Sequence, residues 1–210
     1  MPASTSDAKL ALRERIRANR AELDARALSV EARELLDVVL TVPEIMTAGR
    51  VAAYVSVGRE PGTGPIIEAL VDHDIEVLLP ILLPDFDLDW ARYTGPQSLA
   101  PAARGLLEPT GPALGLDAVT DADAVLVPGL AADRRGTRLG RGGGSYDRVL
   151  ARLSARTRTY VLLHPGELLD IPIPKAAHDV PMQAAITRSG VHRLATPRPS
   201  QHPSPRPHQR

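Results

Sequence analysis

Runs and spacings of apolar residues along the chain predict alternating strands and helices. Apolar stretches at 51–57, 75–79, 124–127, 159–163 and 184–187 predict strands, and the near-continuous run at 51–57 is typical of a strand buried on both faces. Helical spacing predicts helices over 9–28, 30–41, 65–70 and 145–153, with Ser29 as the N-cap of the second. Because strands and helices alternate, the pattern predicts an α/β fold with a parallel sheet and right-handed crossovers.

The remaining segments have weaker patterns. Alternation at 85–93 predicts a half-exposed antiparallel strand, in which Trp90 is either a packing residue or a ligand contact. Residues 94–122, rich in Gly, Pro and Ala, predict a long excursion with little regular structure, and two prolines in 171–174 exclude a central strand there. We therefore expect a single domain over 1–194 and a proline-rich, disordered tail over 195–210.

Composition narrows the classes of function. The 25 Lys and Arg residues equal the 25 Asp and Glu residues, and this zero net charge argues against sequence-independent nucleic-acid binding. The sequence has no Cys, which excludes disulfides and thiolate metal sites. No apolar run approaches a membrane span, and no apolar leader segment opens the chain. We expect a cytoplasmic, monomeric protein that acts on a small molecule, without a nucleic-acid or membrane partner.

Glycine and arginine alternate between the strand at 124–127 and the helix at 145–153. Glycine lets backbone N–H groups approach a ligand, a helix N-terminus favours anions, and arginine donates two hydrogen bonds to one phosphate. The loop lacks the lysine of a Walker motif and the third glycine of the dinucleotide fingerprint. A flexible connection would explain the glycines but not the arginines, so we favour phosphate binding. The residues concerned are Gly136, Gly140, Gly142, Gly143, Gly144, Arg134, Arg135, Arg138 and Arg141.

Several residues outside this loop each allow two interpretations. Lys9 and Arg13 border the apolar face of the first helix, either as a solvated flank or as ligand contacts. Glu60 follows a strand at the edge where open α/β sheets bind ligands, although an ordinary loop carboxylate also fits. Asp147 suits a helix N-terminus or a cation, and Asp179 is a second cation ligand if the C-terminal turn folds over the loop. Since no motif provides a covalent nucleophile, we expect catalysis by positioning and electrostatics.

Short motifs extend these observations along the chain: Lys9-x-x-Leu12-Arg13, Ser56-x-x-x-Glu60-x-x-Thr63, Leu79-Pro80, Gly105-x-x-Glu108-Pro109, Val127-Pro-Gly-Leu-Ala131, Asp133, Gly136, Arg138-Leu-Gly140, Gly142-x-Gly144-x-Tyr146-Asp147 and His178-Asp179. Together they resemble the signature of 5-formyltetrahydrofolate cyclo-ligases, also called methenyltetrahydrofolate synthetases, over about residues 9–190. The resemblance implies a three-layer α/β/α fold related to the ribose-5-phosphate isomerase and CoA-transferase group. It also implies conversion of 5-formyltetrahydrofolate to 5,10-methenyltetrahydrofolate, in which ATP phosphorylates the formyl oxygen and ADP and phosphate are released.

The same resemblance implies roles for individual residues. Lys9 and Arg13 would hold ATP phosphates, and the nucleotide would be wrapped by Arg138, Leu139, Gly140, Arg141, Gly142, Gly143, Gly144, Ser145 and Tyr146. Arg141 would also be catalytic, steadying charge on the transferred phosphoryl group. The folate pocket would contain Val57, Glu60, Gly62, Trp90 and Ser145. Asp147 and Asp179 would bind Mg²⁺.

Three positions depart from the family pattern. The family usually has an aromatic residue at the positions of Ser145 and Ala132, and a carboxylate at that of Gly62. These differences concern the folate side more than the ATP side. The alternative is a non-catalytic nucleotide- or folate-binding protein of the same fold. A phosphosugar isomerase or acyl-CoA transferase relative is disfavoured, because no Glu or Lys stands in the sequence context of those catalytic sites.

Overall fold

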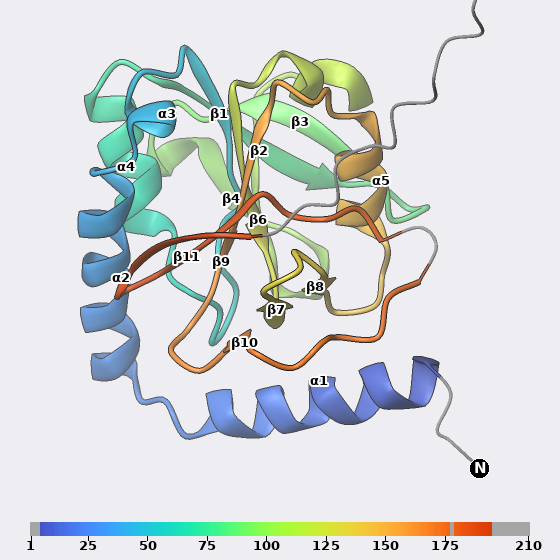
Figure 1. The fold of residues 1–210 in the computed structure, drawn as a ribbon. Coiled ribbons are helices and arrows are strands. Elements are labelled where there is room, and N and C mark those ends of the chain that lie inside the picture. Colours follow the sequence, from blue (N-terminus) through green and yellow to red (C-terminus); the bar gives the residue numbers. More distant parts are fainter. Residues whose placement is uncertain (1–4, 177–178, 195–210) are drawn as a thin grey trace, which may run out of the picture.

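The structure is a computed structural model that describes residues 5–176 and 179–194, arranged around a seven-stranded sheet (Figure 1). The strand order is β12-β11-β9-β6-β1-β2-β3. Five central strands are parallel: β1 (Arg50–Ala52), β2 (Glu76–Leu82), β6 (Ala124–Pro128), β9 (Arg158–Leu162) and β11 (Ala184–Thr187). The edge strands β3 (Leu88–Arg92) and β12 (Gly190–Arg193) are antiparallel to their neighbours. The predicted α/β fold with a mostly parallel central sheet is confirmed.

Helices cover both faces of this sheet (Figure 1). On one side lie α2 (Ala25–Val39), α3 (Pro43–Met46) and α4 (Gly64–Asp72), and on the other lies α5 (Ser145–Arg152). The sequence of β6 is apolar throughout because the strand is buried on both faces. Ala124 and Leu126 belong to the core under α2 and α4, whereas Val125 and Val127 belong to the core under α5. The sheet is therefore the middle of three layers.

A small second sheet supports the start of the glycine loop. Its strand order is β10 (Leu168–Leu169), β7 (Ala131–Asp133) and β8 (Arg138–Leu139). Helix α1 (Thr5–Ala21) lies beneath it, and Ile16 packs with Leu130 and Leu139 in a separate core cluster. Asp133 Oδ1 accepts hydrogen bonds from the backbone N–H groups of Arg135 and Thr137, each at 2.9 Å. These bonds fix the turn that leads into the glycine loop.

The segment 94–122 contains more regular structure than its sequence predicts. Strands β4 (Leu99–Pro101) and β5 (Leu107–Pro109) form an antiparallel hairpin, joined by η2 (Ala103–Gly105) and flanked by the 3₁₀ turns η1 (Pro96–Ser98) and η3 (Leu116–Asp121). Three-residue strands are too short to give a recognisable alternation, which explains the error. The hairpin matters because it forms one wall of the cleft described below.

The first two helices begin earlier than predicted. The boundary lies at Asp24, whose side chain accepts a hydrogen bond from Ala27 N at 2.7 Å and caps α2, so Ser29 lies inside the helix instead of at its N-cap. Strand β2 continues through Pro80, although the sequence predicts that it ends before this proline. Proline is tolerated because β1 ends beside Leu78, so no strand hydrogen bond is lost on that side.

The other predicted elements agree with the structure to within two residues at each end: α4, α5, β6, β9 and β11. Residues 171–174 contain no strand, as their prolines predict. Strand β12 and the small sheet were not predicted. Within the described part of the chain, no helix combines the length and the apolar character needed to cross a membrane. The expected tail over 195–210 lies outside the described residues.

Candidate functional site

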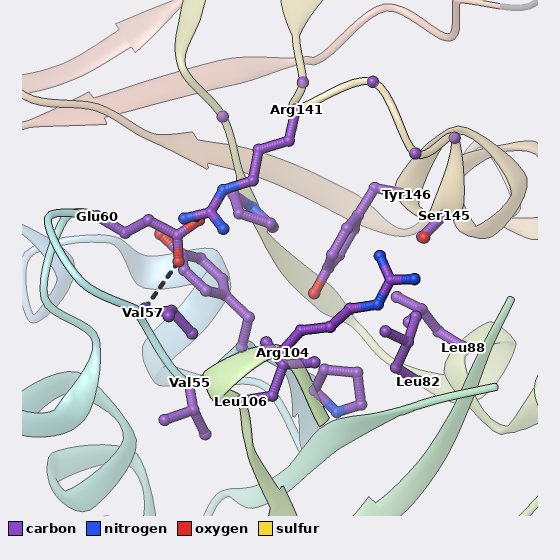
Figure 2. Close-up of a pocket in the computed structure, with 18 of the residues that line it drawn as sticks. Val55, Val57, Glu60, Leu82, Leu88, Arg104, Leu106, Arg141, Ser145 and Tyr146 are labelled. Atoms are coloured by element: carbon purple, nitrogen blue, oxygen red, sulfur yellow. Dashed lines mark hydrogen bonds and ion pairs between the residues drawn. The ribbon is translucent and has the colours of Figure 1, made fainter. Parts of the chain in front are cut away.

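A cleft of about 280 Å³ opens at the carboxyl ends of β1, β2 and β6, where ligands bind in open α/β sheets (Figure 2). One half is apolar and is formed by β2, β3 and the β4–β5 hairpin, through Pro80, Leu82, Leu88, Leu106 and Leu107. The other half is formed by the glycine loop and the first turn of α5, Gly140 to Asp147. The cleft therefore joins an apolar pocket to a loop suited to anions.

The glycine loop has a backbone conformation that needs glycine. Gly142 has φ +105° and Gly144 has φ +76°, values that L side chains rarely adopt. Gly144 is also the N-cap of α5, and no side chain caps the helix there. The first N–H groups of α5 are thus left for an anion, whose charge the helix dipole stabilises.

Arg138 and Asp147 form an ion pair at the base of this loop. Arg138 Nη2 lies 2.6 Å from Asp147 Oδ1, and Arg138 Nη1 donates to Pro128 O at 3.1 Å. The Arg138 side chain is buried, whereas Asp147 is partly exposed and lines the cleft. Arg138 therefore orients Asp147 at the end of the cleft that the glycine loop forms.

Helix α1 connects the glycine loop with the C-terminal turn. Arg13 Nε donates to Gly140 O at 2.9 Å, and Lys9 Nζ, one turn earlier on α1, lies 2.5 Å from Asp179 Oδ2. Asp179 Oδ2 also accepts a hydrogen bond from Ala176 N at 2.8 Å. The basic edge of α1, the loop and the acidic turn are thus neighbours, as the sequence suggested. Asp179 is not among the residues that line the cleft, and His178 lies outside the described residues.

Glu60 and Arg141 face each other across the cleft (Figure 2). Arg141 Nη2 lies 2.9 Å from Glu60 Oε1, and Glu60 Oε2 accepts a hydrogen bond from Val57 N at 2.9 Å. The Glu60 side chain is only 9% exposed, whereas that of Arg141 is 55% exposed. Glu60 is therefore held in place by its own loop, and Arg141 is the partner that can move.

The segment before Glu60 is fixed by Thr63, and not by strand pairing. Thr63 Oγ1 donates to Tyr54 O at 2.6 Å and accepts from Ser56 N at 3.0 Å, and Thr63 N donates to Ser56 Oγ at 3.2 Å. Strand β1 consequently ends at Ala52, five residues before the predicted end of that strand. The backbone then turns its side chains into the cleft, where Tyr54, Val55 and Val57 form part of the wall.

Six residues assigned to the site from the sequence do not line the cleft: Lys9, Arg13, Gly62, Trp90, Leu139 and Asp179. Trp90 is fully buried in the core beneath α5, so a pterin contact at Trp90 does not fit the structure. Gly62 packs on α2, where an added Cβ would lie 2.6 Å from the Ala32 Cβ, too close for any side chain. The Leu139 side chain packs against α1. Val57, Glu60 and Ser145 do line the cleft.

The structure also adds residues that sequence reasoning missed. Arg104, at the tip of the β4–β5 hairpin, lines the cleft and places its guanidinium 4.5 Å from the centre of the Phe86 ring. Tyr54 lines the cleft and is 3% exposed. Tyr54 was hidden inside an apolar run, and Arg104 inside the proline-rich excursion, so neither gave a local signal.

Two tyrosines of the cleft remain neutral. Burial, reinforced by the nearby Glu60 carboxylate, raises the pKa of the Tyr54 phenol well above its ordinary value. Burial and Glu60 likewise raise the pKa of Tyr146. Both hydroxyls are therefore available as hydrogen-bond donors at neutral pH.

Fold and cleft together define a three-layer α/β protein with a glycine-rich loop, suited to anions, beside an apolar pocket. Residues 5–188 match the family model described as the 5-formyltetrahydrofolate cyclo-ligase family. A 5-formyltetrahydrofolate cyclo-ligase of Mycolicibacterium smegmatis is 42% identical over 142 residues, which are 65% of this chain and 72% of the relative. That of Escherichia coli K12 is 30% identical over 73% of this chain and 85% of its own length.

Solved structures agree with these relatives. The NMR structure of Aquifex aeolicus 5,10-methenyltetrahydrofolate synthetase has a TM-score of 0.77 and 26% identity, and the match covers 94% of this chain and 98% of that one. The structure of a 5,10-methenyltetrahydrofolate synthetase from Mycoplasma pneumoniae has a TM-score of 0.68 and 19% identity, over 86% of this chain and 98% of that one, and supports the fold. The chain belongs to the 5-formyltetrahydrofolate cyclo-ligase family.

Proposed function

We propose that the protein converts 5-formyltetrahydrofolate to 5,10-methenyltetrahydrofolate with consumption of ATP, releasing ADP and phosphate. Family membership supports this reaction. The observation that carries it is the pairing of Arg141 with Glu60, which brings a loop suited to phosphate within 2.9 Å of the acidic residue beside an apolar pocket. A phosphoryl donor bound at the loop and an acceptor bound in the apolar half would meet at this point.

The glycine loop is the proposed site for the ATP phosphates. Gly142 to Gly144 and the first turn of α5 offer backbone N–H groups, and Arg141 offers a partly exposed guanidinium. Arg13 contacts this loop from α1, and Lys9 lies one turn earlier on the same helix. Tyr146 follows the loop at the start of α5, with its hydroxyl toward the middle of the cleft.

The reduced folate is proposed to occupy the apolar half. Leu82, Leu88 and Leu106 would contact its flat rings, and Glu60 would accept hydrogen bonds from ring N–H groups. Val57 lines the cleft beside Glu60, and Ser145 lines it at the start of α5.

Asp147 fits a magnesium site. Its carboxylate is partly exposed beside the glycine loop, and Mg²⁺ in nucleotide sites commonly takes one or two carboxylates together with phosphate oxygens and waters. Asp179 is held by Lys9 outside the cleft lining and would reach the ion only after a rearrangement. When bound, the ion supplies positive charge that neutralises the phosphates.

The chemistry that these residues would promote is a phosphoryl transfer followed by ring closure. The formyl oxygen forms a bond to the γ-phosphorus while the bond to the ADP oxygen breaks. N10 then adds to the activated carbon and loses its proton, and phosphate leaves with the former formyl oxygen. Arg141 would stabilise the charge on the transferred group, and the apolar walls would exclude water from it.

The methenyl product absorbs in the near ultraviolet, which gives a direct test. Purified protein mixed with 5-formyltetrahydrofolate and MgATP should develop this absorbance, and omission of ATP should prevent it. Absence of an ATP-dependent band at high protein concentration would reject the reaction and leave a non-catalytic binding protein of the same fold.

A further inference from the structure

The hydroxyl of Tyr54 is a buried polar group without a protein partner. Within the described residues, five buried side-chain atoms have no hydrogen-bond partner: Arg50 Nε, Tyr54 OH, Trp90 Nε1, Arg138 Nε and Tyr146 OH. Three of the five belong to residues that line the cleft, namely Tyr54, Arg138 and Tyr146. Buried polar groups are nearly always paired, so this concentration points to ligand atoms as the partners.

The Tyr54 side chain is held in one position, so its hydroxyl does not reach a partner elsewhere in the protein. Its backbone carbonyl is held by Thr63 Oγ1 at 2.6 Å, and its ring packs in the same core cluster as Ile66 and Leu79. The side chain is only 3% exposed. The hydroxyl is therefore fixed at the cleft wall, where a bound molecule reaches it more readily than bulk solvent does.

The two groups on this wall have opposite hydrogen-bonding character. The Tyr54 phenol is neutral at physiological pH because burial and Glu60 raise its pKa, so it donates a hydrogen bond. Glu60 is an acceptor, and its Oε1 would be available once Arg141 turns to a phosphate. Tyr54 and Glu60 lie on the same segment after β1, and both line the cleft. A ligand that satisfies both must offer an N–H and a carbonyl oxygen on one edge.

We propose that Tyr54 is a substrate-contacting, specificity-determining residue, whose hydroxyl donates a hydrogen bond to the ring carbonyl oxygen of the reduced pteridine while Glu60 accepts from its ring N–H groups. The inference rests on the proposed function, because the pteridine ring of 5-formyltetrahydrofolate carries these groups side by side. It assigns Tyr54 to recognition of the oxo group, and so to discrimination against pteridines that carry an amino group at the same carbon.

The test compares Tyr54→Phe with wild type and varies the ligand in parallel. Removal of the hydroxyl should raise the KM for 5-formyltetrahydrofolate about tenfold, since a buried carbonyl loses its donor, and should leave the KM for ATP within about twofold. In direct binding titrations, wild type should prefer the 4-oxo folate over its 4-amino-4-deoxy analogue, and Tyr54→Phe should lose most of that preference. The midpoint of thermal unfolding should not fall, because the variant removes an unpaired polar atom.

Tyr93→Phe is the matched control. Tyr93 is a buried tyrosine of the same core cluster that does not line the cleft, so both KM values should be unchanged. If the wild type is active and Tyr54→Phe has the same KM for folate, the proposal is overturned. A rise in Tyr54→Phe that is confined to the KM for ATP would overturn it too. Retention of the full oxo-over-amino preference would overturn it as well. If the wild type itself forms no methenyl product, the proposed function is rejected. Failure of the proposed function is thus distinguishable from failure of the role of Tyr54.

Discussion

Arg141 and Glu60 form an ion pair, with Arg141 Nη2 2.9 Å from Glu60 Oε1, between the two halves of the cleft. Under the proposed function, Arg141 would bind ATP and Glu60 would bind folate. In the absence of ligands, each of these residues neutralises the charge of the other. A folate that takes over Glu60 would release Arg141 toward the phosphates. By thermodynamic linkage, the pair would then couple the binding of the two substrates.

Glu60→Gln should therefore strengthen ATP binding to the protein without folate. The substitution removes the charge that holds Arg141, and the expected gain in affinity is about two- to fivefold, since the pair is partly exposed. The KM for folate should rise, because Glu60 is lost as an acceptor. Calorimetric titration with a non-hydrolysable ATP analogue measures the first effect. Glu108→Gln removes a charge from the same cleft without touching Arg141, so an equal gain in both variants would contradict the coupling.

Arg141→Ala should lower kcat by about 10²- to 10³-fold, the usual cost of removing one group that stabilises transition-state charge. Steady-state kinetics at saturating ATP and folate measure this loss. Arg156→Ala, which removes an exposed arginine after α5, should leave kcat within about twofold. A kcat for Arg141→Ala equal to that of wild type would remove Arg141 from the catalytic machinery.

Arg20 and Glu167 form a buried ion pair next to Gly129, which lines the cleft. Arg20 donates to both carboxylate oxygens of Glu167, at 2.7 and 2.8 Å, and to Gly129 O at 2.7 Å. Arg20→Ala leaves a buried carboxylate unpaired and should lower the free energy of unfolding by about 3–5 kcal/mol, measured by urea denaturation. Arg134→Ala, whose partner Asp170 is 85% exposed, should cost less than about 1 kcal/mol. An equal loss of unfolding free energy in the two variants would show that burial of an ion pair does not increase the cost of removing its arginine.

Asp87 and Arg152 tie the turn between β2 and β3 to α5, and this contact predicts a pH dependence. The hydrogen bond from Arg152 lowers the pKa of Asp87 from its ordinary 3.8. Near pH 3.8 the folded protein thus binds fewer protons than the unfolded chain, so the contribution of Asp87 to stability is full at neutral pH. It is lost as the pH falls through the folded pKa.

Asp87→Asn should therefore be less stable than wild type at pH 7, and the gap should narrow below about pH 4. Urea denaturation of both proteins between pH 3 and pH 7 measures it. A gap that stays constant over this range would mean that the Asp87 carboxylate has the same pKa in the folded and unfolded chains.

The central strands were predictable from sequence. A strand such as β6 is buried on both faces of the sheet, so its residues form a continuous apolar run. The place of the glycine loop before α5 was predictable, because a helical pattern follows it in the sequence, whereas phosphate binding by this loop stays a prediction. The side chains that line the cleft could not be predicted from the sequence, because their positions depend on tertiary structure. Trp90 alternates in its strand as a ligand contact would, yet it faces the core, and Tyr54 enters the cleft only because Thr63 diverts the chain after β1.

Transfer of isotopic oxygen tests the central claim most directly. If the formyl oxygen attacks the γ-phosphoryl group in the cleft, 5-formyltetrahydrofolate labelled with ¹⁸O in the formyl group should pass its label to phosphate. Mass spectrometry of the released phosphate should then show one ¹⁸O atom for each methenyl product formed. Unlabelled phosphate, or methenyl product formed without phosphate, would contradict the account.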